Sequence, residues 1–303
     1  MIEQCHARQM ELHAWINPYR AKTKGTTALA NTHEYFRHPD RFFDYDGLLL
    51  FDPGCPENRD YICQVACDIV RRYDVDGIHI DDYFYPYPAA GIPIPDDASY
   101  ARYGNGMDRG DWRRQNVNLF VKQMCHDIRK VKPWVKFGVS PFGIYRNQRT
   151  DPDGSATNGL QNYDDLYADV LEWVRQGWVD YNLPQLYWEV GNRAADYETL
   201  IRWWSNHAGN RPLYIGQSVE RTVKHPDPAN PSQHQMALKY NLQRSLPGIY
   251  GSCQWYAAAV CQNPQGYQDM LRQVYHSTPA LQPIMPWIDS KRPKKPRRTT
   301  VLW

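Results

Sequence analysis

The sequence predicts an α/β protein of the (β/α)8 TIM-barrel type that is incomplete, with strands three to eight present. Short apolar strands alternate with amphipathic helices between residues 11 and 275, a pattern typical of a parallel sheet with right-handed crossovers. Polar, aromatic and proline-rich residues follow each strand, as they do at the working face of such a barrel. Six strand–helix units are visible in the sequence, whereas a closed barrel of this type needs eight.

The elements are expected in a regular order along the chain. The strands are the apolar runs ELHAWIN (11–17), DGIHI (76–80), VKFGVSPFG (135–143), DYNLPQLYW (180–188), PLYIGQSV (212–219) and GIYGSCQWYA (248–257). The helices are residues 57–73, 111–131, 163–177, 195–208, 232–245 and 264–275. Helical spacing is clearest in the first two of these, where apolar residues such as Ile62 and Ile69, or Val117 and Met124, recur on one side.

Composition excludes several classes of protein. A net charge of +2 over 303 residues gives no reason to expect general binding to nucleic acid or to a membrane surface. No stretch is long and apolar enough to span a bilayer. The chain has 11 Trp and 22 Tyr, and aromatic side chains can form a core or line a groove for a sugar.

The seven cysteines do not form a metal-binding pattern. Their number is odd, so they cannot all pair within one chain. Cys63 and Cys67 share one face of an expected helix, which indicates packing rather than metal ligation. No cofactor is expected, since the sequence also lacks a Gly-rich phosphate loop and a nucleophilic Ser elbow.

Two segments differ in character from the barrel units. Residues 85–112 form a long insertion rich in Pro, Gly, Asp and Tyr, as in many functional loops. We expect residues 1–288 to form the barrel domain. Residues 289–303 are expected to be a basic, Pro-rich linker and the start of a further β domain. Six of the eight residues 291–298 are Lys or Arg, which favours a solvated linker over a nucleic-acid or anionic-surface site.

The stretch YDVDGIHIDDYFYPYP (73–88) places acids at both ends of a buried strand. Alternation along DGIHIDD puts His79 and Asp81 on one face and the apolar isoleucines on the other. Asp81 should therefore point into the mouth of the barrel, and Asp82, at the strand end, can turn towards the same cleft. Asp74 and Asp76 precede the strand at the opposite end, where a structural role is expected.

Glycoside hydrolysis usually requires two carboxyl groups, one to protonate the leaving oxygen and one to attack or to activate water. We expect Asp81 to be the nucleophile or base, with Asp82 as the alternative. The expected acid is Glu189, which follows the strand ending in PQLYW. Partial desolvation beside Tyr187 and Trp188 should raise the pKa of Glu189. The competing interpretation is a surface Glu at the start of a loop.

A shell of polar and aromatic side chains is expected around these acids, because sugars need both hydrogen-bonding groups and stacking faces. Its expected members are His13, Asn17, Arg20, His79, Tyr83, Tyr85, Ser140, Tyr145, Arg146, Asn147, Gln185, Tyr187, Trp188, Gln217 and Trp255. His13, His79 and Asp81 could instead hold a metal ion in a deacetylase or hydrolase, but no compact metal motif supports that alternative.

Five stretches resemble the bacterial glycosyl-hydrolase-like family 10: ELHAWINPYR, DGIHIDDYFYPYP, FGVSPFGIYRN, LPQLYWEVGN and PIMPWIDSK. The resemblance covers roughly residues 8 to 290. It implies two further strand–helix units before Glu11, behind an export or lipoprotein signal, and often a β-sandwich-like domain after the barrel. It also implies a location in the cell envelope, in the periplasm or as an outer-membrane lipoprotein.

The resemblance further implies a substrate, since the family includes an enzyme that cleaves peptidoglycan glycan strands lacking stem peptides. The related chitinase pattern D-G-x-D-x-D-x-E is not kept, because His79 and Tyr83 replace two of its acids. We therefore expect a glycoside hydrolase acting on a bacterial cell-envelope glycan. The alternative is a non-catalytic carbohydrate-binding or scaffold protein, which would bind glycan without cleaving it.

Overall fold

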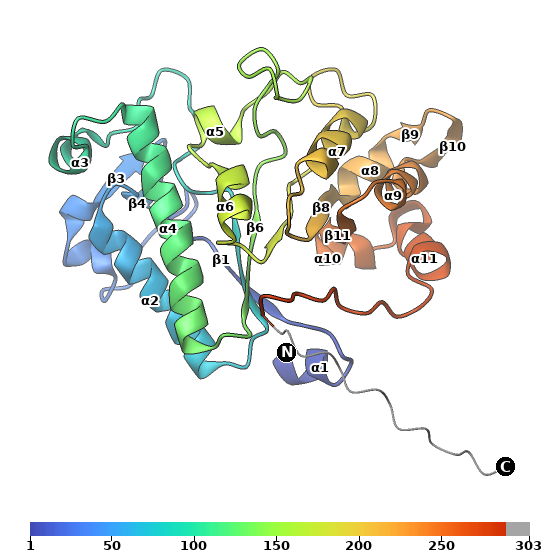
Figure 1. Ribbon diagram of the computed structural model, residues 1–303, viewed down its shortest axis with the longest axis horizontal. Helices are drawn as coiled ribbons and strands as arrows, with labels where there is room; N and C mark the ends of the chain where they lie inside the picture. The colour runs from blue at the N-terminus through green and yellow to red at the C-terminus, as the bar shows by residue number, and fades with distance from the viewer. Residues whose placement is uncertain (289–303) are drawn as a thin grey trace, which may run out of the picture.

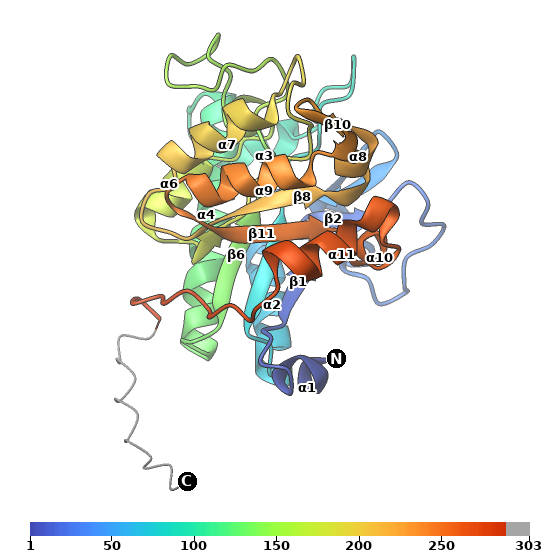
Figure 2. The same cartoon turned by 90° about the vertical axis from the view of Figure 1, so that its right-hand side faces the viewer.

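The computed structural model describes residues 1–288. Six parallel strands form one curled sheet in the order β1-β5-β6-β7-β8-β11, so each strand lies beside the next one along the chain, and helices cover its outer side (Figures 1 and 2). The strands are β1 (His13–Ile16), β5 (Gly77–Asp81), β6 (Lys136–Ser140), β7 (Tyr181–Asn182), β8 (Leu213–Ser218) and β11 (Ile249–Trp255). The predicted incomplete barrel is confirmed, with β1 and β11 as its two outer strands.

The helices pack their apolar sides against the convex face of the sheet. The main ones are α2 (Pro56–Arg72), α4 (Arg109–Val131), α6 (Val170–Gln176), α7 (Tyr197–Asn206) and α9 (Met236–Ser245). Ile78 and Ile80 of β5 are fully buried in the same core as Ile62 of α2 and Met124 of α4. Burial of this apolar face turns the alternate residues of β5 towards the concave side.

A second, small antiparallel sheet after β1 was not predicted. It consists of β2 (Arg20–Lys22), β3 (Phe42–Tyr45) and β4 (Leu48–Phe51), in the order β2-β4-β3, with η1 (Glu34–Phe36) and η2 (Pro39–Arg41) before β3. Asp46 and Gly47 join β3 to β4 with φ of 47° and 76°. Two left-handed residues suit a two-residue hairpin, and Asp-Gly between apolar runs is its usual signal. FFDYDGLLLF therefore carried a signal for this hairpin.

Several smaller elements lie in the connections. They are α1 (Ile2–His6), α3 (Asp97–Tyr103), α5 (Asn162–Asp165), α8 (Val219–Lys224), β9 (Pro226–Asp227), β10 (Asn230–His234), α10 (Ala257–Cys261), η3 (Pro264–Gly266), α11 (Tyr267–Met270) and η4 (Leu271–Tyr275). The helix predicted over 163–177 is divided into α5 and α6, with Tyr167 between them at φ 56°. The helix predicted from residue 232 begins at Met236, because residues 230–234 pair with β9.

The strand predicted over 180–188 is shorter than expected. Only Tyr181 and Asn182 form β7, and Pro184 follows with no N–H to donate to a neighbouring strand. Gln185 then makes isolated bridges to Phe142 and Gly216. The chain therefore continues between its neighbours as far as Gln185, although the regular ladder ends earlier.

The segment after η4 crosses the amino ends of the strands (Figure 1). Trp287 donates its Nε1–H to Asp180 Oδ1 at 2.7 Å, and the Arg211 guanidinium lies 3.9 Å from the centre of the Trp287 ring. Asp180 immediately precedes β7, so this contact attaches the segment at the end of the sheet opposite the predicted site. The predicted linker and β domain, residues 289–303, lie outside the described residues. Within residues 1–288, no helix combines the length and the apolar character needed to cross a bilayer.

Candidate active site

Asp81 and Asp82 lie together at the carboxyl end of β5. Asp81 is the last residue of the strand and is in register with Ser140 of β6. Because Ile78 and Ile80 face the helices, Asp81 faces the concave side, as the alternation predicts. Asp82 follows and is 1% exposed. The structure thus brings two carboxyl groups to the end of a barrel strand where active sites of this fold are built.

The two aspartates have different surroundings. Burial raises the pKa of Asp82, but Tyr87, which donates its hydroxyl to Oδ2, and the nearby Gln185 side chain oppose the rise. Burial and then the charge of Asp82 raise the pKa of Asp81 to about 6, against opposing effects of Trp15 and Arg20. Burial thus raises the pKa of both carboxyl groups, and the charge of Asp82 acts on Asp81 in addition.

Arg20 supplies a positive charge that acts on both aspartates. Its guanidinium carbon lies 4.0 Å from the centre of the Tyr83 ring, and its charge lowers the pKa of both Asp81 and Asp82. Its Nε is buried without a hydrogen-bond partner among the described residues. Arg20 begins β2, so the unpredicted small sheet is the element that positions this predicted site residue.

An aromatic hollow of about 230 Å³ adjoins the aspartates. It is lined by Tyr87, Phe142, Gln185, Tyr187, Trp188 and Arg221. The Phe142 and Trp188 rings meet edge to face with centres 5.4 Å apart. Burial and then charges that include Asp81 and Asp82 raise the pKa of Tyr187. The hollow is therefore close to the carboxyl pair and has the flat apolar walls on which a sugar ring can stack.

Tyr87 separates this hollow from a second one of about 240 Å³ that Arg20 and Tyr83 line. Tyr85 also borders the second hollow, but the residue is fully buried and its hydroxyl accepts a hydrogen bond from Asn116 Nδ2 at 3.2 Å. Sequence reasoning missed Tyr87, the residue that contacts Asp82. The YFYPYP run placed several tyrosines after the strand without showing which of them turns back to it.

Glu189 does not have the environment expected of a general acid. Burial raises its pKa, but a 2.7 Å hydrogen bond from Asn192 and the charges of His225 and Arg221 outweigh burial, so the pKa is lowered. The predicted rise is therefore wrong. His225 Nε2 lies 3.6 Å from Glu189 Oε2, whereas Glu189 is not among the groups that shift the pKa of Asp81. Glu189 as the acid stays a prediction, without the raised pKa on which it was based.

Lys239 holds the loop that carries Trp188 and Glu189. Its Nζ donates to the Trp188 carbonyl oxygen at 2.8 Å and to Thr222 Oγ1 at 3.2 Å. Lys239 is 1% exposed, and burial lowers its pKa to about 7. Sequence reasoning missed this residue. The available signal was a lysine three positions after Met236, on the apolar side of α9.

Three predicted substrate contacts have structural partners away from the aspartates. Tyr145 donates its hydroxyl to Asp169 Oδ1 at 2.8 Å, and Arg146 forms ion pairs with Asp151 and Asp164. Asn147 is fully buried and donates to the Gly159 carbonyl oxygen at 2.8 Å. Tyr145 and Arg146 border another hollow, of about 270 Å³, together with Trp203. Their observed contacts stabilise the loop after β6, and a role for them in binding substrate stays a prediction.

The remaining predicted residues lie on or near the sheet. His13 and His79 both bond the Tyr181 hydroxyl on the concave side. Asn17 has a buried Oδ1 without a partner among the described residues, and Gln217 donates to the Tyr197 hydroxyl at 2.6 Å. Trp255 is 57% exposed at the end of β11. Trp15, which was not predicted, lies on β1 with the same alternation as His13, and it lowers the pKa of Asp81 against the effect of burial.

The structure gives no support to the metal-centre alternative at His13, His79 and Asp81. Within residues 1–288, no group of three or more His, Cys, Asp or Glu side chains is placed to hold a metal ion. Burial lowers the pKa of His79 to about 4, so its ring is neutral near pH 7. Cys63 and Cys67 are buried free thiols in α2, in agreement with the predicted packing role.

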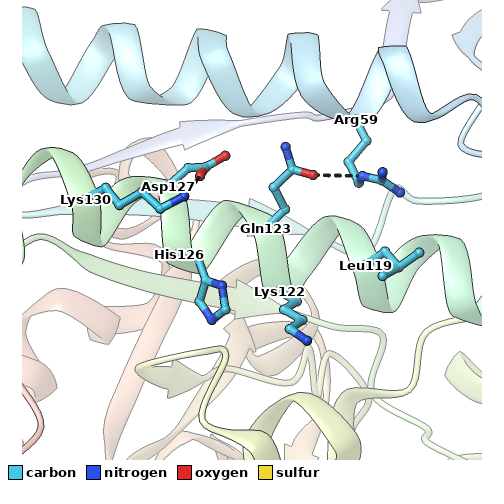
Figure 3. A pocket seen from close by; sticks show the side chains of 7 residues that line it. All are labelled: Arg59, Leu119, Lys122, Gln123, His126, Asp127 and Lys130. Carbon is cyan, nitrogen blue, oxygen red and sulfur yellow. Dashed lines mark hydrogen bonds and ion pairs between the residues drawn. The ribbon is translucent and has the colours of Figure 1, made fainter.

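A hollow of about 350 Å³ lies on the outer helix layer and is separate from this site. Figure 3 shows its lining, in which Arg59 of α2 donates to Gln123 of α4 at 2.9 Å, beside Lys122, His126 and Lys130. It lies on the convex side, away from the carboxyl ends of the strands. The candidate active site is therefore defined by Asp81, Asp82, Arg20, Tyr87 and the aromatic hollow.

Comparison with known proteins bears on the family of the chain and on its fold. The family model described as glycosyl hydrolase-like 10 matches residues 1–235, which confirms the resemblance found in the sequence. The chain is 44% identical to glycosyl hydrolase YngK of Bacillus subtilis (strain 168), covering 99% of this chain and 60% of that protein. It is 39% identical to glycosyl hydrolase DigH of Escherichia coli (strain K12), covering 83% and 61%.

These figures mean that the chain spans about 60% of the length of the curated relatives it matches. Among solved structures, the PgaB (BpsB) glycoside hydrolase domain from Bordetella bronchiseptica is similar in fold, with a TM-score of 0.51. That match has 14% sequence identity and covers 88% of this chain and 75% of that chain.

Proposed function

The chain belongs to the glycosyl hydrolase-like 10 family, and on that premise we propose that it carries the acid–base site of a glycoside hydrolase. The observation that supports the proposal most directly is the carboxyl pair Asp81–Asp82, at the carboxyl end of a barrel strand and next to an aromatic hollow. Two carboxyl groups held in different environments are the usual requirement for glycoside hydrolysis.

The roles of the two aspartates follow from their surroundings. Asp81, with a pKa raised to about 6, donates a proton to the leaving glycosidic oxygen. Asp82 accepts a hydrogen bond from Tyr87, which favours its charged form, and as a carboxylate it stabilises the positive charge that develops on the sugar ring before water attacks it. This assignment reverses the sequence-based expectation that Asp81 is the nucleophile or base.

The proposed substrate is a glycan of the bacterial cell envelope, with peptide-free peptidoglycan strands as the specific candidate. The support is the resemblance in sequence, together with apolar walls at Phe142 and Trp188 that suit the faces of sugar rings. A cell-envelope location, in the periplasm or as an outer-membrane lipoprotein, is proposed on the basis of the resemblance in sequence.

Mass spectrometry of peptide-free glycan strands incubated with the protein tests this proposal. The protein should release short saccharides, and the Asp81→Asn variant should release none while still binding the strands in a pull-down assay. Equal release by the two proteins would exclude Asp81 as the catalytic acid. Binding by both proteins without release by either would favour the alternative of a carbohydrate-binding protein without catalysis.

A further inference from the structure

A chain of hydrogen bonds crosses the concave face below Asp81. Lys136 donates to Glu11 Oε1 at 2.5 Å, and Glu11 Oε2 lies 3.0 Å from His13 Nε2. His13 Nδ1 lies 2.8 Å from the Tyr181 hydroxyl, which is also 2.9 Å from His79 Nδ1. The chain thus joins β1, β5, β6 and β7, and Tyr181, which is 6% exposed, is its central member.

Two strand glycines leave room for this arrangement. A Cβ atom at Gly77 would lie 2.6 Å from Nδ1 of the His13 ring, and one at Gly138 would overlap the Tyr181 ring. Gly77 begins β5 and Gly138 lies in the middle of β6, and a glycine in a strand often marks a close approach of other atoms. The absence of side chains at these two positions allows both rings to lie across the sheet.

The order of the protons along the chain follows from its charged end. The Glu11 carboxylate, paired with Lys136, can only accept, so His13 carries its proton on Nε2. When the His13 ring holds this one proton, its Nδ1 accepts the Tyr181 O–H, and the Tyr181 oxygen is left to accept Nδ1–H of His79. Neutral His79 therefore has a free lone pair on Nε2.

That lone pair is available to a ligand. Among residues 1–288, His79 makes one side-chain hydrogen bond, through Nδ1, so Nε2 has no partner there. Nε2 is nevertheless not one of the fully enclosed atoms without a partner, which means that it is accessible. His79 lies two residues before Asp81 on the same face of β5, a separation of about 7 Å along a strand. A sugar held at Asp81 could therefore direct a substituent towards Nε2 of His79.

We propose that Tyr181 is a positioning residue that fixes the tautomer of His79, and that Nε2 of His79 accepts a hydrogen bond from the sugar bound at Asp81. The inference about the substrate contact rests on the proposed function, whereas the inference about the tautomer does not. The donor is an N–H or O–H of the substrate, supplied by an acetamido group or by a hydroxyl group.

NMR of the full chain with ¹⁵N-labelled histidine at pH 8 tests the tautomer. The His79 signals are assigned from their loss in a His79→Gln variant. In the parent the proton of His79 should reside on Nδ1, and in Tyr181→Phe it should move largely to Nε2. Tyr214→Phe is the matched control, because that ring packs against Tyr181 at 5.8 Å and its hydroxyl bonds neither histidine.

A parent protein with the proton on Nε2, or a Tyr181→Phe variant that keeps it on Nδ1, would overturn the proposal. Thermal unfolding of the Tyr181→Phe and Tyr214→Phe variants shows whether each is folded. If the Tyr181→Phe variant does not fold, the tautomer of His79 measured in the parent protein tests the proposal by itself.

Calorimetric titration tests the substrate contact. The probes are a peptide-free peptidoglycan tetrasaccharide and its de-N-acetylated form, titrated into Asp81→Asn with and without His79→Phe. The added substitution should weaken binding of the acetylated form about tenfold, the upper range for loss of one hydrogen bond. A loss of affinity confined to the acetylated probe assigns the donor to the acetamido group. An equal loss of affinity for both probes assigns the donor to a hydroxyl group.

Unchanged affinity for both probes would overturn the contact. If Asp81→Asn and the parent both bind neither probe, the proposed function itself fails, and the substrate contact fails with it. The tautomer of His79 is still decided by NMR in that case, so the two failures can be distinguished.

Discussion

The two ends of β5 each carry a pair of aspartates, and the pairs behave differently. At the amino end, Asp76 accepts hydrogen bonds from Leu12 N at 2.7 Å and from His6 at 3.0 Å, and the Asp74 side chain is 77% exposed. At the carboxyl end, Asp82 is 1% exposed, and the pKa of Asp81 is raised to about 6. Residue type alone therefore does not identify a catalytic acid; burial and nearby donors and charges do.

The largest expected effect is on turnover at Asp81. Asp81→Asn should lower kcat on the order of a thousandfold, because the amide has no acidic proton to donate. Asp74→Asn is the matched control, since it makes the same change in an exposed side chain at the other end of the strand. Steady-state kinetics on glycan strands would measure both, and equal losses would remove the distinction between the two ends.

The comparison extends to two lysines. Lys136, at the start of β6, is paired with Glu11, whereas Lys239 is buried against the Trp188 carbonyl and Thr222 at the carboxyl ends of the strands. Burial lowers the pKa of Lys239 to about 7, below its ordinary value of 10.5. Between these values the unfolded chain binds more protons than the folded one, so this residue makes stability rise with pH.

Between pH 7 and 10.5, the free energy of unfolding should rise by up to about 1.4 kcal/mol per pH unit because of Lys239. Lys239→Met should remove this contribution, because methionine keeps much of the buried volume but does not titrate. Urea unfolding between pH 7 and 10 would measure it. A parent and a variant with the same pH dependence would show that Lys239 is charged throughout, and the explanation by burial would then fail.

At the amino end the expected effect is on stability alone. Asp76→Ala removes the acceptor for the Leu12 backbone N–H and should lower the free energy of unfolding by about 2 kcal/mol. Turnover per folded molecule should be unchanged. Urea unfolding together with active-site titration separates the two quantities, and a loss of turnover in the folded variant would show that this end also serves the reaction.

The smallest effect concerns the pH profile. If Asp81 is the acid, kcat/KM should fall as pH rises above about 6, because the free enzyme loses the proton that it must donate. Asp82→Asn removes the neighbouring negative charge, which lowers the pKa of Asp81. The alkaline limb of the variant's residual activity should therefore move to lower pH. A limb that stays in place would mean that Asp82 does not influence Asp81.

Much of the fold could be predicted because the six parallel strands are buried on one face and follow one another in the chain. The position of Asp81 followed from the same alternation. The roles of the polar shell could not be predicted, because they depend on contacts between residues distant in the chain. Tyr145 and Arg146 follow β6 as Tyr87 follows β5, yet the first two bond loop acids and the third bonds Asp82.

Glu189 shows the same difficulty. Its place after an aromatic run suggested desolvation, but the folded loop returns Asn192 to its carboxylate and brings His225 near. Conversely, Lys239 and Tyr181 were missed because the apolar side of a helix and a place in a strand indicate burial but not the partner of the side chain. Lys239 bonds a backbone carbonyl oxygen, and Tyr181 bonds two imidazole rings, and all of these partners belong to other parts of the chain.

Gly77 and Gly138 have a consequence for comparing relatives by sequence alone. Even alanine at either position would place an atom inside the His13 or Tyr181 ring contact. A relative that has lost the rings is free to vary at both glycines, whereas one that keeps the rings is not. Gly77, Gly138, His13 and Tyr181 should therefore change together across the family. An aligned set of relatives would show which members share the chain of hydrogen bonds across the concave face.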